Sequence, residues 1–500
     1  MFCVTFFSIC TRALGFLLKI YLSRELGSVL LGSYQVAMSV FGVLVTIVSS
    51  GIPVVLSRKV SYLHTQNDKK SIGSVVSSGL ILTIILCLFI SIITILFPQC
   101  LNLLFISQAS SEMMLILVPA LIANAIYEVF NGALWGAQEF FSISFNEFLE
   151  QLIRIIILVI LFNTSAINTT LTNKSALSLS LACIVSTTLI IIIYFKKGGK
   201  LSNPKPEFKS LLKSSSPLTA LKTISSIVSS FISLIIPIRL MTYGYTSTEA
   251  LSEFGIVMGM TFPLIMIPST LIGSLAVTIT PSISKFSNNI NTLNTNDKSF
   301  IRNKINSTIK TTAIFSTLLL STFISLGNPL CTFIYDNTKA GVYLSAATIA
   351  MIPLGISQIT SAILNALGLE MKSLKSYAIS ALVLILCIFF LPRYIGTYAL
   401  IVGYFLMSVT SASLNLELLN KHQLVDFTFF KTIFIMIVIG LFSALLTSSI
   451  YNLISGLGIL ALIISGIISI LSTGVLLVTF DVAKIKTFVF RKKHRLQNVF

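Results

Sequence analysis

Apolar runs recur along the whole chain, and short polar breaks separate them. An α-helix needs about 20 predominantly apolar residues to cross a bilayer. The pattern therefore predicts an all-α integral membrane protein with about fourteen transmembrane helices. The predicted spans cover residues 2–23, 31–57, 73–97, 113–136, 142–162, 176–195, 215–241, 251–281, 307–327, 341–368, 374–391, 396–418, 429–450 and 456–480.

The composition supports this prediction. Of the 500 residues, 55% are hydrophobic and only 10% are charged, whereas soluble domains carry about 25% charged residues. So few ionic groups cannot cover a water-exposed surface. The first apolar stretch has no basic leader and carries Arg12 at its middle, so we interpret it as a retained helix and not as a signal peptide.

The basic residues lie mostly on one side of the predicted spans. If the amino end is cytoplasmic, the outer segments hold only Arg24, Lys174, Arg239, Lys339 and Arg393. The positive-inside rule then predicts that both termini are cytoplasmic. The net charge of +18 is thus explained by basic residues that orient the helices in the membrane. No nucleic-acid partner is expected. The basic tail either lies on the anionic leaflet or is solvated.

Paired motifs predict two similar halves. The second and eighth spans both contain Gly and Pro. The fourth and tenth spans both end with a short segment that runs from an Asn to a Gly. Such parallel repeats place a substrate path between halves that rock against each other; ordinary helix packing is the alternative. The predicted domains are an N-terminal six-helix lobe (1–200), a C-terminal six-helix lobe (201–425), a terminal two-helix pair (426–483) and a basic cytoplasmic tail (484–500).

No cofactor or metal is expected. The seven cysteines are scattered without a CxxC pair, and the three histidines lie in polar segments away from them. We interpret the cysteines as small buried hydrophobic residues. The segment at Gly198 and Gly199 lacks the glycine spacing of a nucleotide-binding loop.

Ionisable residues within the spans are candidates for a substrate site, because each costs roughly 3 kcal/mol to place in a bilayer. Arg12 lies mid-span, and Lys19 follows seven residues later on nearly the same helical face, with the small Gly15 between them. This pattern is typical of an aqueous cavity that receives an anion. Two alternatives stay open: Arg12 pairs with a structural carboxylate, and Lys19 extends to the outer interface.

The span at residues 142–162 carries Glu150 and Arg154 four positions apart, where they can neutralise one another. One interpretation is a self-contained pair that permits insertion into the membrane. The other is that Glu150 bridges to Arg12 as a gate latch and leaves Arg154 for the substrate.

Three further residues complete the candidate set. Glu128 and Lys222 are each either cavity residues or partners of another charge, and Arg58 is either an interface anchor or a guide for an anion. The deep charges are mainly cationic, which suits a phosphate or carboxylate cargo. The predicted substrate-binding residues are Arg12, Lys19, Arg58, Glu128, Glu150, Arg154 and Lys222.

Six short motifs follow one another along the chain. They are Thr11-Arg12-Ala-Leu-Gly-Phe16, Ser23-Arg24-Glu-Leu-Gly27, Gly32-Ser-Tyr-Gln35, Gly51-Ile-Pro53, Ser57-Arg58-Lys59 and Glu150-Gln151-Leu-Ile-Arg154. Together they resemble the multidrug/oligosaccharidyl-lipid/polysaccharide exporter superfamily, in its branch of polysaccharide transporters like stage V sporulation protein B, which is related to lipid II flippases. The resemblance covers essentially the whole chain. It also agrees with the predicted count of two six-helix halves and a terminal pair of helices.

The resemblance implies a flippase of the bacterial plasma membrane. It would move an undecaprenyl-diphosphate-linked glycan, a peptidoglycan precursor or polysaccharide unit, from the inner to the outer leaflet by alternating access. In that family a cationic cavity of the first half receives the headgroup, and the last two helices can form a groove for the lipid tail. Arg12 matches the family's arginine; where a second is expected, this chain has Leu18 and then Lys19. The implied partners are the lipid-linked glycan, membrane lipids and cell-envelope synthesis enzymes.

Three other functions are alternatives to a flippase. A multidrug or small-molecule exporter of the same superfamily would favour a compact acidic site for organic cations, whereas these deep charges are mainly positive. An enzyme would need acid/base residues at a membrane face, but the outer loops are short and nearly free of Asp, Glu and His. We therefore expect no enzymatic activity. A scaffold for synthetic enzymes is the remaining alternative.

Overall fold

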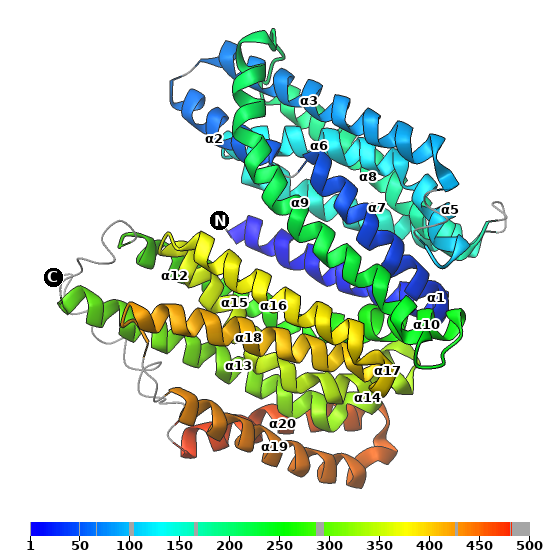
Figure 1. Ribbon diagram of the computed structural model, residues 1–500, viewed down its shortest axis with the longest axis vertical. Coiled ribbons are helices and arrows are strands. Elements are labelled where there is room, and N and C mark those ends of the chain that lie inside the picture. The colour runs from blue at the N-terminus through cyan, green and yellow to red at the C-terminus, as the bar shows by residue number, and fades with distance from the viewer. Residues whose placement is uncertain are drawn as a thin grey trace. The chain divides into compact units, whose positions relative to one another are not determined.

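The structure, a computed structural model, describes residues 2–49, 51–66, 68–99, 105–164, 169–286, 295–425, 429–480 and 482. Within these ranges every regular element is a helix (Figure 1). The predicted cytoplasmic tail, residues 484–500, lies outside the described residues.

The chain divides into two compact units, Met1–Gly259 and Met260–Phe500. The predicted lobes follow the sequence repeat and not the packing, so their boundaries stay predictions. The helices of the first unit are α1 (Phe2–Ser49), α2 (Ile52–Thr65), α3 (Lys69–Leu96), α5 (Gln108–Ile116), α6 (Val118–Gly136), α7 (Phe140–Asn163), α8 (Leu171–Lys196), α9 (Lys205–Met241) and α10 (Ser247–Gly255).

A short π-helix, η1 (Ile256–Thr261), follows α10. The α-helices of the second unit are α11 (Phe262–Ile265), α12 (Ile267–Ser284), α13 (Thr295–Tyr335), α14 (Thr338–Ala347), α15 (Met351–Ala366), α16 (Glu370–Phe390), α17 (Pro392–Ile395), α18 (Tyr398–Lys421), α19 (Phe429–Ile454) and α20 (Ile459–Thr479). Two 3₁₀ turns, η3 (Thr348–Ala350) and η4 (Ser455–Leu457), join consecutive helices.

Membrane-spanning helices make up most of the described chain. Eleven helical stretches are long and apolar enough to cross a membrane, and a twelfth is formed by α5 and α6 together, which meet at 46°. One of the eleven, Cys3–Thr65, contains the first two predicted spans. α7 matches a further predicted span but carries Glu147, Glu150 and Arg154. The structure thus confirms an all-α multi-pass membrane protein with roughly the predicted number of spans.

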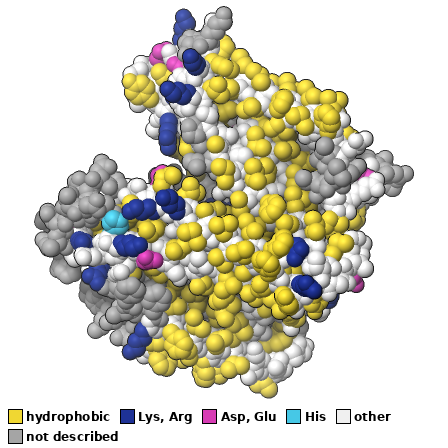
Figure 2. Space-filling model, in the orientation of Figure 1, with side chains coloured by type: hydrophobic (Ala, Val, Ile, Leu, Met, Phe, Trp, Pro, Cys, Tyr) yellow, Lys and Arg dark blue, Asp and Glu magenta, His cyan; other side chains and the backbone are white. Residues whose placement is uncertain are grey.

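The outer surface of the bundle is apolar. Large hydrophobic side chains on separate helices are open to the surroundings, among them Leu453, Val277 and Leu445, which are 85%, 72% and 69% exposed. Figure 2 shows hydrophobic side chains over most of the visible face of the helices, with Lys and Arg toward the margins. This distribution fits a chain whose solvent is lipid, since a soluble protein rarely exposes such large apolar areas.

The span predicted at 31–57 covers parts of two helices. α1 is described to Ser49, and α2 begins at Ile52 with Pro53 in its first turn; both lie in the apolar stretch Cys3–Thr65. A Cβ on Gly51, directly before α2, would lie 2.2 Å from Oγ1 of Thr219 on α9. Because glycine has no Cβ, α9 approaches the backbone closely at this point.

The span predicted at 251–281 is likewise divided into α10, η1, α11 and α12. Pro263 and Pro268 occupy the first turns of α11 and α12. A proline lacks the N–H that would continue the helical hydrogen bonds, so it fits the first turn of a new helix. Periodicity alone predicted one continuous span, because the apolar pattern persists across the breaks.

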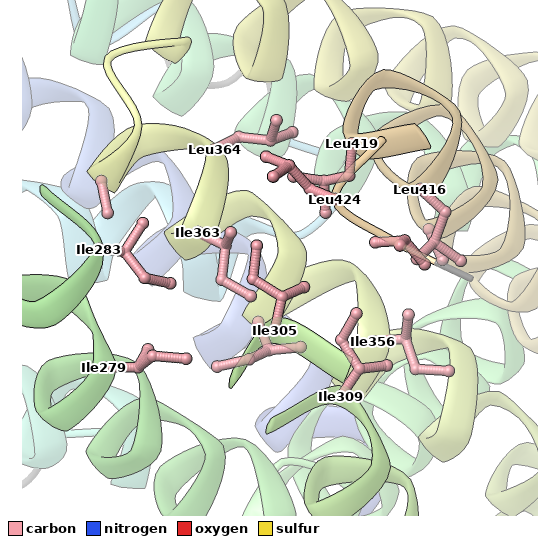
Figure 3. Close-up of a cluster of buried hydrophobic side chains, with 14 of the residues drawn as sticks. Ile279, Ile283, Ile305, Ile309, Ile356, Ile363, Leu364, Leu416, Leu419 and Leu424 are labelled. Atoms are coloured by element: carbon pink, nitrogen blue, oxygen red, sulfur yellow. The ribbon is translucent and has the colours of Figure 1, made fainter. Parts of the chain in front are cut away.

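A core cluster of the second unit includes the amino-terminal part of α13, which starts before the predicted residue 307. α13 begins at Thr295, and Ile301, Ile305 and Ile309 on its polar amino-terminal part are fully buried. Figure 3 shows Ile305 and Ile309 facing isoleucines of α12 and α15. The four-residue spacing of these isoleucines gives this segment one apolar stripe. Because the rest of the segment is polar, the long apolar runs did not predict this part of the helix.

The terminal helices pack on α13 through buried hydroxyl groups. Ser321 Oγ lies 2.9 Å from Ser469 Oγ and 2.7 Å from Thr473 Oγ1, both on α20. Thr473 Oγ1 in turn donates to Ser443 Oγ on α19 at 2.7 Å. Small side chains with hydrogen bonds let helices approach closely where no water competes. The predicted terminal pair is thus an integral layer of the second unit.

Candidate functional site

The candidate site lies in the first unit beside α7, which packs along the first half of α1. The Phe7 and Phe148 rings are 5.4 Å apart, and the Tyr21 and Phe162 rings are 5.8 Å apart. The contact positions increase together along both helices, so the first half of α1 and α7 run parallel and side by side. The polar residues at the middle of each helix are thereby brought to a similar depth.

A kink at Gly27 turns the second half of α1 back over the same region. Gly27 has φ 63° and ψ 176°, a conformation that strongly favours glycine. Figure 1 shows the two arms of α1, in dark blue, meeting at an angle. We call residues 2–26 the first arm and residues 28–49 the second arm. The kink lets both arms of one helix contribute to a single cavity.

The second arm is held in place by a close crossing with α10. A Cβ on Gly32 would lie 2.0 Å from the Leu251 carbonyl oxygen, and one on Gly255 would lie 2.2 Å from the Ser28 carbonyl oxygen. Ser252 Oγ also donates to Ser28 Oγ at 2.7 Å. Glycine and serine at four-residue spacing allow this approach, as in other membrane helix pairs.

The two arms and α7 enclose a cavity of about 240 Å³. Two of its lining residues are basic and, among the residues that the structure describes around it, none is acidic. The lining residues are Gly15, Leu18, Lys19, Leu22, Leu31, Tyr34, Gln35, Met38, Gln151, Arg154 and Gly259. The cavity therefore combines positive charge with amide and hydroxyl groups, between helices that are otherwise apolar.

Arg154 is oriented by the second arm of α1. Its Nη2 donates to the Tyr34 hydroxyl at 3.0 Å, and Tyr34 is 7% exposed. Lys19 lines the same cavity and lies close enough to Arg154 for mutual electrostatic repulsion. Two like charges that line one cavity favour an anion between them.

Two polar atoms at the cavity are buried without a hydrogen-bond partner: Arg154 Nε and Gln151 Oε1. Gln151 and Arg154 are three residues apart on α7 and therefore neighbours on one helical face. A buried polar group without a partner costs about 1–3 kcal/mol. Because both atoms have almost no accessible surface, neither is presented to the cavity in this conformation.

The predicted carboxylates lie apart from the cavity lining. Glu150 accepts a long hydrogen bond from Cys183 Sγ at 3.9 Å and also bonds the Ser186 side chain on α8. Glu128 on α6 bonds Asn131 and lies within electrostatic range of Glu150. Among the described residues, no group of His, Cys, Asp and Glu is arranged to hold a metal ion.

Neither of the two pairings considered for Glu150 is an ion pair within 4 Å among the described residues. Arg154 nevertheless lies close enough to attract the Glu150 carboxylate electrostatically, so the neutralisation of one by the other stays a prediction. Arg154 turns toward Tyr34 on α1. The physical reason is that four-residue spacing permits contact, while packing against α1 and α8 decides the rotamers.

The other predicted basic residues are exposed and do not line the cavity. Arg12 lies on the first arm with an exposed side chain, seven residues before Lys19, and Arg58 is exposed on α2. Lys222 on α9 is exposed and lies within electrostatic range of Glu128. The structure therefore brings Lys19 and Arg154 together, while the roles of the other five candidates stay predictions.

Three polar lining residues were missed at first: Tyr34, Gln35 and Gln151. All three lie within the motifs that carried the family resemblance, so their signal was present in the sequence. The prediction considered only ionisable groups, because these are the most costly to place in a membrane. Amides and hydroxyls there also need hydrogen-bond partners.

A kinked helix and the helix parallel to its first arm thus line a polar cavity within a multi-pass membrane protein. The chain belongs to the polysaccharide biosynthesis protein family, whose sequence profile matches residues 1–287. It is 23% identical to stage V sporulation protein B of Bacillus subtilis (strain 168) over 289 residues. That match spans 55% of each chain, about half the length of the relative.

Solved structures share the fold over nearly the whole chain. The lipid II flippase MurJ, in an inward closed conformation, superposes with a TM-score of 0.72 at 16% identity, covering 97% of this chain and 100% of that one. An inward-facing multidrug resistance transporter of the MATE family and MOP superfamily gives 0.67 at 16% identity, covering 83% and 94%. These comparisons confirm the resemblance inferred from the sequence motifs.

Proposed function

We propose that this protein is a flippase that moves an undecaprenyl-diphosphate-linked glycan from the inner to the outer leaflet by alternating access. The observation that carries the proposal is the pair of basic side chains, Lys19 and Arg154, in a cavity without an acidic lining residue among those described. Each cation costs about 3 kcal/mol at this depth. A diphosphate would offset that cost, because an arginine fork matches phosphate oxygens well.

In this proposal the other basic residues form an approach to the cavity. Arg12 precedes Lys19 by two helical turns on α1, so the two extend one positive stripe toward the amino end. Arg58 would guide the anion at the inner surface, with both termini cytoplasmic. Glu128, Glu150 and Lys222 would balance charge around the cavity as it opens and closes. Membrane potential or an ion gradient would supply the motive force.

The direct test uses purified protein in liposomes with a fluorescent polyprenyl-diphosphate sugar. Neutral variants Arg154→Gln and Lys19→Gln should each slow transfer between leaflets at least about tenfold, the effect of losing roughly 1.4 kcal/mol. Lys421→Gln, which removes an exposed charge paired with Glu417, is the matched control and should leave the rate unchanged. A wild-type chain that moves no such lipid under any imposed potential would overturn the proposal.

The competing function is export of a small organic molecule by the same fold, as the multidrug transporter structure allows. It predicts a different phenotype in native cells. Depletion of the protein should trap lipid-linked glycan on the inner leaflet if it is a flippase. If outer-leaflet glycan is unchanged and sensitivity to cationic drugs rises, the exporter function is favoured. Arg12→Ala belongs in the same experiment and should fail to restore outer-leaflet glycan.

A further inference from the structure

We propose that the end of the first unit where α9 begins is a platform for the headgroups of anionic phospholipids. Five exposed lysines, here called the basic platform, form it: Lys69 and Lys70 at the start of α3, Lys200 in the loop between α8 and α9, and Lys209 and Lys213 on the first turns of α9. Figure 2 shows Lys and Arg side chains gathered at this end of the unit, where Figure 1 draws α2 and the start of α9. The proposal is independent of the proposed function.

The acidic side chains described at this end of the unit already have partners. Glu207 pairs with Lys59, and Glu139 pairs with Lys197 at 2.9 Å. Asp68 accepts two hydrogen bonds at the start of α3. Among the described residues, none of the five platform lysines is in an ion pair within 4 Å. Their positive charge is therefore available to an anion from outside the chain.

The loop that carries Lys200 is fixed to α3 through its backbone. Ser74 Oγ donates to the Asn203 carbonyl oxygen at 2.7 Å. A Cβ on Gly73 would lie 2.6 Å from the Lys200 carbonyl oxygen, so the loop lies directly on the helix at that point. Lys200 is thereby held beside the first turn of α3, which begins at Lys69. A site whose backbone is already ordered loses little conformational entropy when a ligand binds.

The first turns of α9 present a mixed basic and apolar face. Leu211 is fully buried in the core of the first unit, which fixes the rotation of the helix. Lys209, Leu212 and Lys213 follow at helical spacing and are exposed, so they share the outward side, with Leu212 45% exposed. Lysines beside an exposed leucine are typical of helices that lie at a membrane surface, because the ammonium groups contact phosphates while the apolar chain enters the acyl boundary.

The basic platform lies at the level where membrane spans end. Three helical stretches that are long and apolar enough to cross a membrane have an end there: Lys69–Leu96, Leu171–Lys196 and Glu207–Met241. Lipid headgroups are therefore within reach of the platform whenever the chain is in a membrane, and anionic lipids attract basic segments next to a span. Orientation of the helices requires only enough basic residues on one side, whereas a fixed arrangement of lysines favours a defined headgroup site.

The test counts the lipids bound to the purified full chain by native mass spectrometry, with no polyprenyl lipid present. The probes are phosphatidylglycerol and phosphatidylcholine with the same acyl chains. The wild-type chain should bind a first phosphatidylglycerol at least about tenfold more tightly than a first phosphatidylcholine, since one lysine near anionic lipid contributes about fivefold. The platform variant Lys200→Gln/Lys209→Gln/Lys213→Gln should reduce this ratio to within about twofold.

The matched control removes the same charge from the second unit, in Lys372→Gln/Lys375→Gln/Lys421→Gln. These lysines are exposed as well, and the control should keep the wild-type ratio. Arg154→Gln should also keep it, because the phospholipid binds outside the cavity. An equal loss in the platform variant and the control would assign the preference to net charge and overturn the proposal, as would a ratio that survives in the platform variant. A wild-type chain without any preference would also overturn it and leave an acidic protein as the partner of this surface.

Discussion

Lys59 on α2 and Glu207 on α9 form an ion pair, and the Lys59 ammonium also donates to Ser210 Oγ at 2.7 Å. Both charged side chains are about one quarter exposed, at 25% and 29%. On the same side of α9, Ser78 Oγ of α3 donates to the Pro204 carbonyl oxygen at 2.8 Å. These contacts attach the first turns of α9 to two neighbouring helices of the first unit.

Reversal of one charge of this pair should loosen the start of α9. Lys59→Glu places two carboxylates together, so amide hydrogen exchange over residues 207–213 should become faster. The double variant Lys59→Glu/Glu207→Lys should restore much of the protection, with a coupling of about 0.5–1 kcal/mol for a partly exposed pair. Unchanged exchange in the single variant would show that contacts other than those of Lys59, such as that of Ser78, hold the start of α9.

The crossing of α1 and α10 should tolerate no side chain at its closest point. Gly255→Ala places a Cβ 2.2 Å from the Ser28 carbonyl oxygen, which is backbone and cannot move alone. We expect destabilisation of about 1–3 kcal/mol, as for overpacked cores, measured as a lower melting temperature in detergent.

The control for that variant is Gly42→Ala on the same arm of α1. A Cβ there meets nothing within 4 Å, and alanine is the better helix former. Its melting temperature should equal or exceed that of the wild type. If both variants melt alike, the close crossing does not contribute to stability.

The Tyr34 hydroxyl should matter for transport more than for folding. Tyr34→Phe keeps the ring and removes the acceptor for Arg154 Nη2. Because the guanidinium then loses its fixed orientation, we expect about a fivefold slower transfer of the lipid probe, equivalent to roughly 1 kcal/mol. Tyr21→Phe keeps its ring contact with Phe162 and should transfer at the wild-type rate. Equal rates for the two variants would contradict the positioning role of Tyr34.

Asp68, the residue that caps α3, should make stability depend on pH. Its side chain accepts from the Ser71 hydroxyl and from the Ser71 backbone N–H, and these bonds lower the pKa of Asp68 below its ordinary value of 3.8. A carboxylate with a lowered pKa in the folded state stabilises the fold above pH 3.8 and loses this effect as the pH falls through the lowered pKa.

The matched variant is Asp68→Asn, which keeps the capping shape and removes the charge. Its melting temperature should lie below that of the wild type at pH 7. The difference should shrink once the pH falls below 3.8 and vanish when the wild-type carboxyl is protonated. A difference that does not change with pH would show that ionisation of Asp68 does not contribute to stability.

Several features of the fold could be predicted from particular residues. The apolar runs predicted the helices, since about 20 apolar residues are required to cross a bilayer whatever they pack against. The second and eighth predicted spans share Gly and Pro, and the structure places Pro53 and Pro263 in the first turns of α2 and α11, where a proline leaves no helical hydrogen bond unmade. The apolar runs did not predict the long amino-terminal extension of α13. Ile301 and Ile305 are buried there, but they form a narrow apolar stripe and not a continuous apolar run.

What the sequence by itself determined is the class of protein: its membrane spans, the one-sided distribution of basic residues and the family motifs. All of these depend on local composition and order along the chain. Only the tertiary structure decided which deep charges meet. Glu150 and Arg154 are one helical turn apart, yet Arg154 pairs with Tyr34 and Glu150 faces Cys183. Helical spacing sets which side chains can touch, whereas the neighbouring helix on each face determines which contacts form.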